Sequence, residues 1–347
     1  MDVRFFLGAN SGTGFYSLYD GFCCGEGDFL NLIKAGPGGG KSSFMRAIAA
    51  AAAERGYDTE CILCSGDPDS LDAVYIPELH LGYMDATAPH AGEPGCFAHD
   101  SRYVNLGEFC ERISDPRAVE LTDKYRSMYK TAYAYLTAAA SIENVQLTEL
   151  ASADIIGKVR SRAKRAAERE LGRKASGSGR VYRRFVRCIS CRGELVLAES
   201  VKKLCKRIYL LDDRYSLAQE YLAELLEQVK IRGENAIVCP SPLLPERLEA
   251  VLLPECSAGF VLSRMMPDEQ AGRHIRLDAL LPRESAAAVK AELRKKEKLT
   301  RELTDEAVRW MARAKEYHDE LERVYNPHVD FCALDDFCKA EIERIFA

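Results

Sequence analysis

The hydrophobic positions of the chain alternate between short continuous runs and longer stretches with helical spacing. The runs DFLNLIK (28–34) and TECILC (59–64) are typical of buried β-strands, because they are short and almost uninterrupted. Between them, SSFMRAIAAAAAERG (42–56) contains strong helix formers and places Phe44 and Ile48 on one face. Strands that alternate with helices predict an α/β fold, with a parallel sheet flanked by helices in three layers.

The same pattern occurs twice along the chain, at a constant offset of 177 residues. Residues 56–78 and 233–255 align without a gap and share seven identical residues. The same offset places the apolar run LNLIK (30–34) on RIYLL (207–211). We therefore predict two tandem units of one fold.

Long stretches with helical spacing follow each unit and set the expected domain boundaries. We predict a first domain over 1–175, with a helical extension at about 115–172. The second domain covers 176–347 and ends in long helices at about 284–346. The apolar stripes of these helices favour a helical hairpin appended to each unit, and the alternative is a zipper with a partner protein.

A glycine-rich stretch, IKAGPGGGKSSF (33–44), separates the first strand from the first helix. Ala35, Gly40, Lys41 and Ser42 meet the pattern of a phosphate-binding loop, which requires this order of strand, loop and helix. Glycines allow backbone N–H groups to surround phosphate oxygens, and the helix N-terminus adds a positive dipole. Lys41 would contact the β- and γ-phosphates, and Ser42 would bind Mg²⁺. The predicted nucleotide-binding residues are Ala35, Gly36, Pro37, Gly38, Gly39, Gly40, Lys41, Ser42 and Ser43. The alternative is a glycine-rich turn beside a surface lysine.

Acidic residues at two strand ends could complete such a site. Asp85 ends the apolar run LHLGYMD, and Asp67 and Asp69 follow the strand-like TECILC. Ligands of open α/β sheets bind at the carboxyl ends of the strands. We prefer Asp85 for Mg²⁺ or its bound water. Asp67 and Asp69 could instead bind metal or a phosphate acceptor, and the alternative is that Asp69 caps a short helical turn. The predicted catalytic set is Lys41, Asp85, Asp67 and Asp69, with Ser42 and Asp85 as metal ligands.

The second unit has no glycine loop at the equivalent place. There the offset aligns DDRYSLAQ (212–219), and Lys41 corresponds to Ala218. We expect Asp212 and Asp213 to repel phosphate. The second unit is therefore predicted to keep the scaffold and to lack nucleotide binding.

Two further polar features have both a functional and a structural interpretation. GANSGTGF (8–15) could contact nucleotide through Asn10, Ser11 and Thr13, or it could be a plain turn. His90 could serve as a base or polar contact near Asp85, or it could be structural.

Composition and charge restrict the class of protein. The chain is 47% hydrophobic and 29% charged, with a formal net charge of −5, which is typical of a globular protein. The acidic start MDVRFFLGANSG and the absence of any apolar run of about 18 residues predict neither a signal peptide nor a membrane partner, and so a cytoplasmic protein. The 13 cysteines are expected as reduced thiols, and Cys188 and Cys191 have the spacing of half a zinc site.

One basic segment contrasts with the acidic chain. Residues 157–187 contain twelve Lys or Arg residues against two Glu. The segment could bind nucleic acid, with Tyr182 and Phe185 stacking on bases, or place an arginine on a neighbouring γ-phosphate. The alternative is a solvated helix face followed by a flexible linker, ASGSG.

Taken together, these segments resemble a known family. FFLGANSGTGFYSLYD, IKAGPGGGKSSFM, SGDPDSLDAVYIPEL, MDATAPH, YVNLGEF and AKEYHDELERVYNPHVDF, in this order, are similar to bacterial P-loop ATPase-like proteins with tandem P-loop units. The resemblance implies ATP binding at Gly36 to Ser43, with metal or chemistry at Asp67, Asp69 and Asp85. This chain departs from the family at 212–219, where a second glycine loop would be expected.

The expected activity is Mg²⁺-dependent binding and hydrolysis of ATP or GTP at one N-terminal P-loop site, in tandem P-loop NTPase-like domains. One alternative is a small-molecule or nucleotide kinase, in which the Asp67/Asp69 loop binds the acceptor. The other is a non-enzymatic module whose helices report nucleotide occupancy to a partner.

Overall fold

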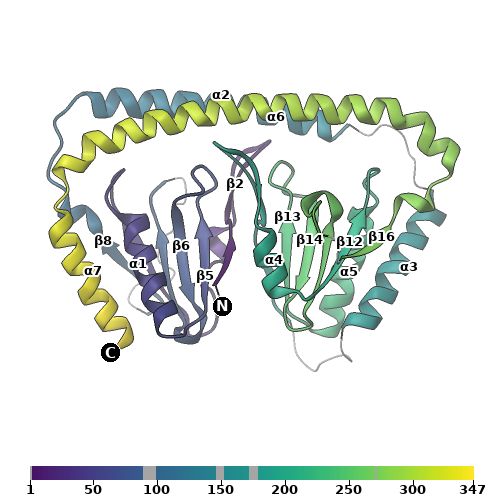
Figure 1. Ribbon diagram of the computed structural model, residues 1–347, viewed down its shortest axis with the longest axis horizontal. Coiled ribbons are helices and arrows are strands. Elements are labelled where there is room, and N and C mark those ends of the chain that lie inside the picture. Colours follow the sequence, from purple (N-terminus) through teal and green to yellow (C-terminus); the bar gives the residue numbers. More distant parts are fainter. Residues whose placement is uncertain (1, 89–98, 146–151, 172–178, 270–271) are drawn as a thin grey trace.

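The computed structural model describes residues 2–88, 99–145, 152–171, 179–269 and 272–347, so His90 lies outside the described residues. The chain forms two α/β lobes side by side, and a pair of long helices lies across both of them (Figure 1). Each lobe has a mixed sheet of mostly parallel strands with helices packed on it.

The first lobe contains a six-stranded sheet in the order β1-β5-β6-β7-β4-β8. Neighbouring strands are parallel except at β6, which runs antiparallel to both β5 and β7. Helix α1 (Lys41–Glu54) packs on this sheet through Phe44, Met45 and Ile48, all fully buried. The strands are β1 (Asp2–Phe5), β4 (Phe29–Lys34), β5 (Thr59–Leu63), β6 (Leu71–Ile76), β7 (Leu81–Asp85) and β8 (Ser101–Asn105).

The second lobe repeats this topology strand for strand. Its sheet has the order β16-β12-β15-β14-β13-β9, with β14 as the antiparallel strand and helix α5 (Ala218–Arg232) in the place of α1. The offset seen in the sequence separates β5 from β13 and β6 from β14, so the internal repeat corresponds to a repeated structure. The strands are β9 (Val181–Arg183), β12 (Arg207–Asp212), β13 (Ala236–Pro240), β14 (Leu248–Leu253), β15 (Ala258–Leu262) and β16 (Arg273–Arg276). The short helices are α4 (Ala198–Leu204), η1 (Tyr19–Gly21), η2 (Pro77–Leu79), η3 (Leu106–Phe109), η4 (Ser263–Met265), η5 (Asp278–Leu280) and η6 (Asn326–His328).

The segment GANSGTGF forms a hairpin of β2 (Gly8–Ser11) and β3 (Gly14–Ser17) where the lobes meet. Asn10 is buried, and its amide donates to the carbonyls of Ser65, at 3.3 Å, and Ile189, at 2.8 Å. Ser11 Oγ donates to the carbonyl of Gly14 within the same hairpin. Ile189 belongs to the equivalent hairpin of the second lobe, β10 (Arg187–Ser190) and β11 (Gly193–Val196). The Asn10 amide therefore joins the two lobes, the Ser11 hydroxyl stabilises the hairpin, and a nucleotide contact is not needed to explain either group.

The helices that follow each sheet cross between the lobes. Helix α2 (Arg117–Glu143) pairs along α6 (Arg283–Tyr325), and the two run antiparallel across the molecule (Figure 1). Helix α3 (Ala153–Glu170) packs against α5 of the second lobe, and α7 (Phe331–Phe346) packs against α1 of the first. We expected a hairpin within each unit, but the small residues Ala132 and Ala139 of α2 face Ala307 of α6 in one buried cluster. An apolar stripe can be buried by any matching stripe, so the spacing alone did not specify the partner.

Helix α7 is attached to the first sheet by the buried carboxylate of Glu341. It accepts hydrogen bonds from Tyr83 Oη on β7 and Arg102 Nη2 on β8, both at 2.5 Å, and from Arg344 Nη2 at 2.7 Å. Burial alone would raise the pKa of Glu341, but the bonds from Arg344 and Tyr83 and the charge of Arg102 lower it to about 2. The carboxylate is thus held in its ionised form.

Glu341→Gln should make the protein less stable at neutral pH and less sensitive to acid. Because the folded-state pKa lies below the ordinary value of 4.5, the contribution of Glu341 is complete above that pH and is lost as the pH falls toward 2. We expect a loss of about 2 kcal/mol at pH 7, measured by urea unfolding between pH 7 and 3. Glu343→Gln, at an exposed position of the same helix, is the control and should leave both quantities unchanged. If the free energy of unfolding falls as steeply with decreasing pH in Glu341→Gln as in the wild type, this role of Glu341 is contradicted.

Within the part of the chain that the structure describes, no helix combines the length and apolar character needed to cross a membrane.

Candidate functional site

The glycine-rich stretch forms the connection between β4 and α1. β4 ends at Lys34 and α1 begins at Lys41, so the six residues between them make the turn. Gly38 and Gly40 have φ angles of 65° and 77°, a region that L-residues with side chains rarely adopt. Lys41 folds back over the turn, and its Nζ donates to the carbonyls of Gly36, at 3.1 Å, and Ala35, at 3.3 Å. The loop thus combines a helix N-terminus with a lysine placed over it, as phosphate binding requires.

Asp85 lies beside this loop because β7 pairs in parallel with β4, with Asp85 opposite Ile33. Its Oδ2 atom is 3.6 Å from Lys41 Nζ, and the side chain is largely buried. Its Oδ1 atom accepts from Thr87 N, at 2.8 Å, and from Thr87 Oγ1, at 2.6 Å. The structure therefore brings together the lysine and the acid that the sequence singled out.

Ser42 also faces the sheet, whereas Ser43 is exposed. Ser42 Oγ accepts a hydrogen bond of 2.9 Å from Leu71 N at the start of β6, and one of 3.3 Å from Arg46 Nε. These bonds orient the hydroxyl from which a metal contact was predicted.

Asp67 and Asp69 lie in the turn between β5 and β6, and both form ion pairs. Asp67 Oδ2 is 3.5 Å from Lys315 Nζ of α6, and Asp69 pairs with Arg192 of the second lobe's hairpin. The proposed capping role of Asp69 is wrong, because β6 follows directly and no helix begins there. It is the Asp67 side chain that holds the turn, accepting from Ser70 Oγ at 3.2 Å.

The end of α6 lies directly on the glycine loop, which the sequence analysis did not anticipate. A methyl group on Gly36 would come within 2.9 Å of the Tyr325 ring, and one on Gly38 within 2.5 Å of Asn326 Oδ1. On the same helix, potential ligand atoms of His318, Asp319 and Glu322 lie within 4.8 Å of one another. These residues are separated from the loop by almost 300 positions, so no local sequence signal connects them with it.

In the second lobe, a carboxylate occupies the turn that would hold phosphate. Asp213 accepts hydrogen bonds from three backbone N–H groups at the start of α5: Tyr215 at 3.1 Å, Leu217 at 2.9 Å and Ala218 at 2.9 Å. We expected Asp212 and Asp213 to repel phosphate from an open loop. Instead, Asp213 itself saturates the N–H groups, while Asp212 pairs with His274 at 2.8 Å.

The other positions of the predicted site have also changed in the second lobe. Gln219 takes the place of Ser42, and its side chain bonds both the N–H and the carbonyl of Leu248. This matches the bond from Leu71 N to Ser42 in the first lobe. At the end of β15, Leu262 stands where β7 has Asp85. The second lobe keeps the scaffold contacts and lacks the lysine, the serine and the acid.

Asp213→Ala should destabilise the second lobe, because three N–H groups at the start of α5 would lose their acceptor. We expect a loss of about 2 kcal/mol in the free energy of unfolding, measured by chemical denaturation. Asp212→Ala is the matched control. Its ion pair with His274 is solvent-accessible, so the loss should stay below about 1 kcal/mol. Equal losses in the two variants would show that the N–H contacts of Asp213 are not the cause.

The basic segment is mostly engaged within the molecule. Helix α3 buries Ile155, Val159 and Ala163, and its Arg160 pairs with Glu220 of α5 at 2.7 Å. Helix α3 packs on the second lobe, whereas the glycine loop belongs to the first. The arginines of α3 therefore do not reach the loop of the same chain (Figure 1). The suggestion that Phe185 stacks on nucleic acid is wrong, because its side chain is fully buried. The linker residues 172–178 lie outside the described residues.

The cysteine pair considered for zinc has a structural setting. Cys188 is buried in β10, and burial raises the pKa of its thiol above the ordinary value. Cys191 is half-buried in the turn that follows. In the described ranges, the only group with metal-ligand geometry is His318, Asp319 and Glu322.

Compared with known proteins, the chain matches no family model, no curated protein and no solved structure. The class of the site therefore rests on its own geometry.

Proposed function

We propose that the protein binds a nucleoside triphosphate with Mg²⁺ at the glycine loop of the first lobe and hydrolyses it, as a P-loop NTPase. The observation that carries the proposal is the convergence of Lys41 and Asp85, 3.6 Å apart, at the N-terminus of α1. A cation, a carboxylate and a helix N-terminus in one place are what triphosphate and its metal need. The resemblance of the sequence motifs to P-loop ATPase-like proteins supports the same assignment.

Each residue of the site has a defined part in this proposal. The backbone N–H groups of Gly36 and of residues 38–43 bind the phosphates, and Lys41 exchanges the carbonyls of Ala35 and Gly36 for the β- and γ-phosphates. Asp85 supplies a carboxylate oxygen, and Ser42 supplies a hydroxyl oxygen once its longer bond from Arg46 is released; both are donors that Mg²⁺ prefers. The metal would neutralise charge that develops on the transferred phosphoryl group. Because Asp213 saturates the equivalent turn, we propose one nucleotide per chain, either ATP or GTP.

The proposal is tested by thermal melting and phosphate release of the wild-type protein with Mg-ATP and Mg-GTP. A ligand at a hundred times its Kd adds about 2.7 kcal/mol of stability, which shifts the melting temperature by several degrees. Equilibrium dialysis should give one nucleotide per chain. A melting temperature that neither nucleotide changes would overturn the proposal, and two nucleotides per chain would overturn its single-site part.

A second candidate function is favoured by the position of α6. Tyr325 and Asn326 contact the glycine loop, so nucleotide binding could displace the helix and report occupancy to a partner. Binding without turnover would favour this nucleotide-gated module. A kinase, in which Asp67 and Asp69 bind the acceptor, would instead release ADP only with an acceptor present. Both acids would then have to leave the ion pairs with Lys315 and Arg192.

A further inference from the structure

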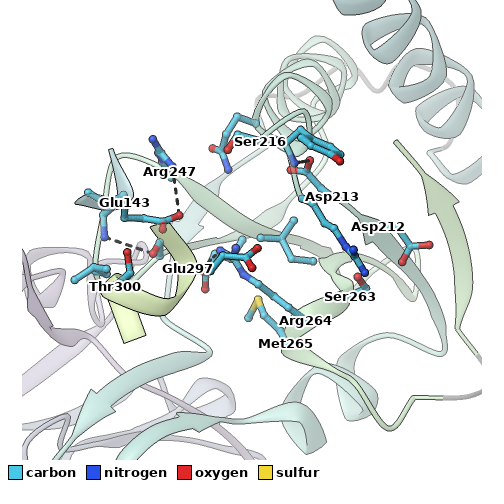
Figure 2. Close-up of a pocket in the computed structure, with 18 of the residues that line it drawn as sticks. Glu143, Asp212, Asp213, Ser216, Arg247, Ser263, Arg264, Met265, Glu297 and Thr300 are labelled. Atoms are coloured by element: carbon cyan, nitrogen blue, oxygen red, sulfur yellow. Dashed lines mark hydrogen bonds and ion pairs between the residues drawn. The ribbon is translucent and has the colours of Figure 1, made fainter. Parts of the chain in front are cut away.

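The second lobe contains a large cavity at the place that corresponds to the nucleotide site of the first. It has a volume of about 1780 Å³, more than most small-molecule sites, and lies between the carboxyl edge of the second sheet and α6. Figure 2 shows Glu143, Arg247 and Thr300 on one side of it, Asp212, Asp213 and Ser216 on the other, and Arg264 between them. The lobe without a phosphate loop has thus kept a space for a ligand.

At the sheet side of the cavity, several charged and polar groups are already paired within the protein. Asp213 occupies the backbone N–H groups at the start of α5, so no ligand phosphate can bind them. Glu249 is 1% exposed and accepts two hydrogen bonds from Arg187, at 2.5 and 2.9 Å. Recognition of a ligand must therefore come mainly from the other side chains that line the cavity.

Three cations from three different parts of the chain line the cavity. Arg247 directly precedes β14, Arg264 belongs to η4 after β15, and Lys296 lies on α6 across from them. Arg264 is 3.1 Å from Glu249, whose charge Arg187 already shares, and its side chain is 58% exposed. Arg247 donates to Asn144 Oδ1 at 2.6 Å and is 3.9 Å from Glu143. The two arginines therefore keep much of their positive charge available to a ligand.

Lys296 is the least compensated of the three. Its Nζ donates to the carbonyl of Val145 at 3.4 Å, and within the described ranges no carboxylate lies at ion-pair distance from it. Burial lowers the pKa of Lys296, and Arg247 and Arg264 lower it further, against the opposing charges of Glu143 and Glu297. One turn along α6, Thr300 Oγ1 is buried with no hydrogen-bond partner among the residues that the structure describes. A half-buried ammonium and a buried free hydroxyl are costly unless a ligand satisfies them.

We propose that this cavity binds a small organic anion, whose phosphate or carboxylate group lies among Arg247, Arg264 and Lys296 and accepts a hydrogen bond from Thr300. The site is separate from the glycine loop, and the proposal does not depend on nucleotide binding there. Glu297 and Asp305 of α6, and the other acids of the lining, Glu194, Glu269 and Asp278, would face the rest of the ligand and favour a molecule that also carries hydroxyl or amino groups.

The test uses the full-length Lys41→Ala variant, in which the glycine loop is disabled, with tripolyphosphate and citrate as probes at constant ionic strength. We expect at least one probe to raise the melting temperature, tripolyphosphate if the site selects phosphate and citrate if it selects carboxylate. Adding Lys296→Met should weaken binding of that probe at least tenfold, because a charge-assisted hydrogen bond is lost. Without a probe, the same substitution should raise the melting temperature, because an uncompensated charge leaves the cavity wall.

Lys295→Met is the matched control, since Lys295 is exposed on the neighbouring face of α6 and does not line the cavity. It should change neither the melting temperature without probe nor the response to the probe. Arg264→Gln provides a second variant and should also weaken the probe at least tenfold. The proposal is overturned if neither anion stabilises the protein, if Lys296→Met and Arg264→Gln respond as strongly as their parent, or if spermine stabilises it and the anions do not.

Discussion

Alanine in place of Lys41 should abolish the stabilisation that Mg-ATP or Mg-GTP gives to the protein and should lower phosphate release at least a hundredfold. Among the described residues, Lys41 donates to the carbonyls of Ala35 and Gly36 and lies 3.6 Å from Asp85. Asp85 keeps its two hydrogen bonds from Thr87 in this variant, so the effect of nucleotide is measured against the variant's own stability without nucleotide. With nucleotide, the variant loses the cation on the β- and γ-phosphates and so the gain of about 2.7 kcal/mol expected at a hundred times the Kd.

The measurement is a melting curve with and without each Mg-nucleotide, together with steady-state phosphate release. Lys130→Ala, at an exposed position of α2, serves as the control and should behave as the wild type. Asp85→Asn should keep part of the binding but lose its dependence on Mg²⁺. If Lys41→Ala binds and hydrolyses nucleotide like the wild type, the glycine loop is not the site.

Among the substitutions considered, Glu249→Ala should produce the largest loss in the free energy of unfolding, about 3 kcal/mol. Glu249 is buried on β14 and holds the side chain of Arg187 by two hydrogen bonds. Burial alone would raise the pKa of Glu249, but the charges and hydrogen bonds of Arg187 and Arg264 lower it below the ordinary value. Removing the carboxylate leaves the guanidinium of Arg187 buried without its main partner. The cost of that unpaired charge is larger than the net stabilisation that the intact pair provides.

The same arginine offers a matched control. Arg187 Nη1 also contacts Glu194 at 2.8 Å, but that carboxylate is 51% exposed. Glu194→Gln should therefore cost less than about 1 kcal/mol, measured like Glu249→Ala by the urea dependence of circular dichroism. The double variant Arg187→Met with Glu249→Leu should recover most of the loss, because no charge is then left buried. A similar loss for Glu194→Gln and Glu249→Ala would show that burial of the pair is not the cause.

Several features of the candidate site could be predicted because their signals are local. The glycine loop, Lys41 and the strand that ends in Asp85 are each encoded within a few consecutive residues. The parallel pairing of β4 with β7 then brings Asp85 to the loop, as expected for acids at the carboxyl ends of neighbouring strands. The contacts of Asp67 and Asp69 could not be predicted, because Lys315 and Arg192 lie more than 100 residues away in the sequence.

The sequence by itself determined the α/β class, the strand–loop–helix unit around Lys41, and its repetition at a constant offset. These follow from periodicity, glycine content and register, which act over a few residues at a time. Only the tertiary structure decided that α2 pairs with α6, that Tyr325 lies on the glycine loop, and that Phe185 is buried. An apolar stripe requires burial without naming its partner, so the crossing of the helices depended on the shape of the whole molecule. Asp213 shows the same limit. The sequence shows an acid in the place of the glycine loop, but only the folded turn shows that its carboxylate accepts hydrogen bonds from three backbone N–H groups.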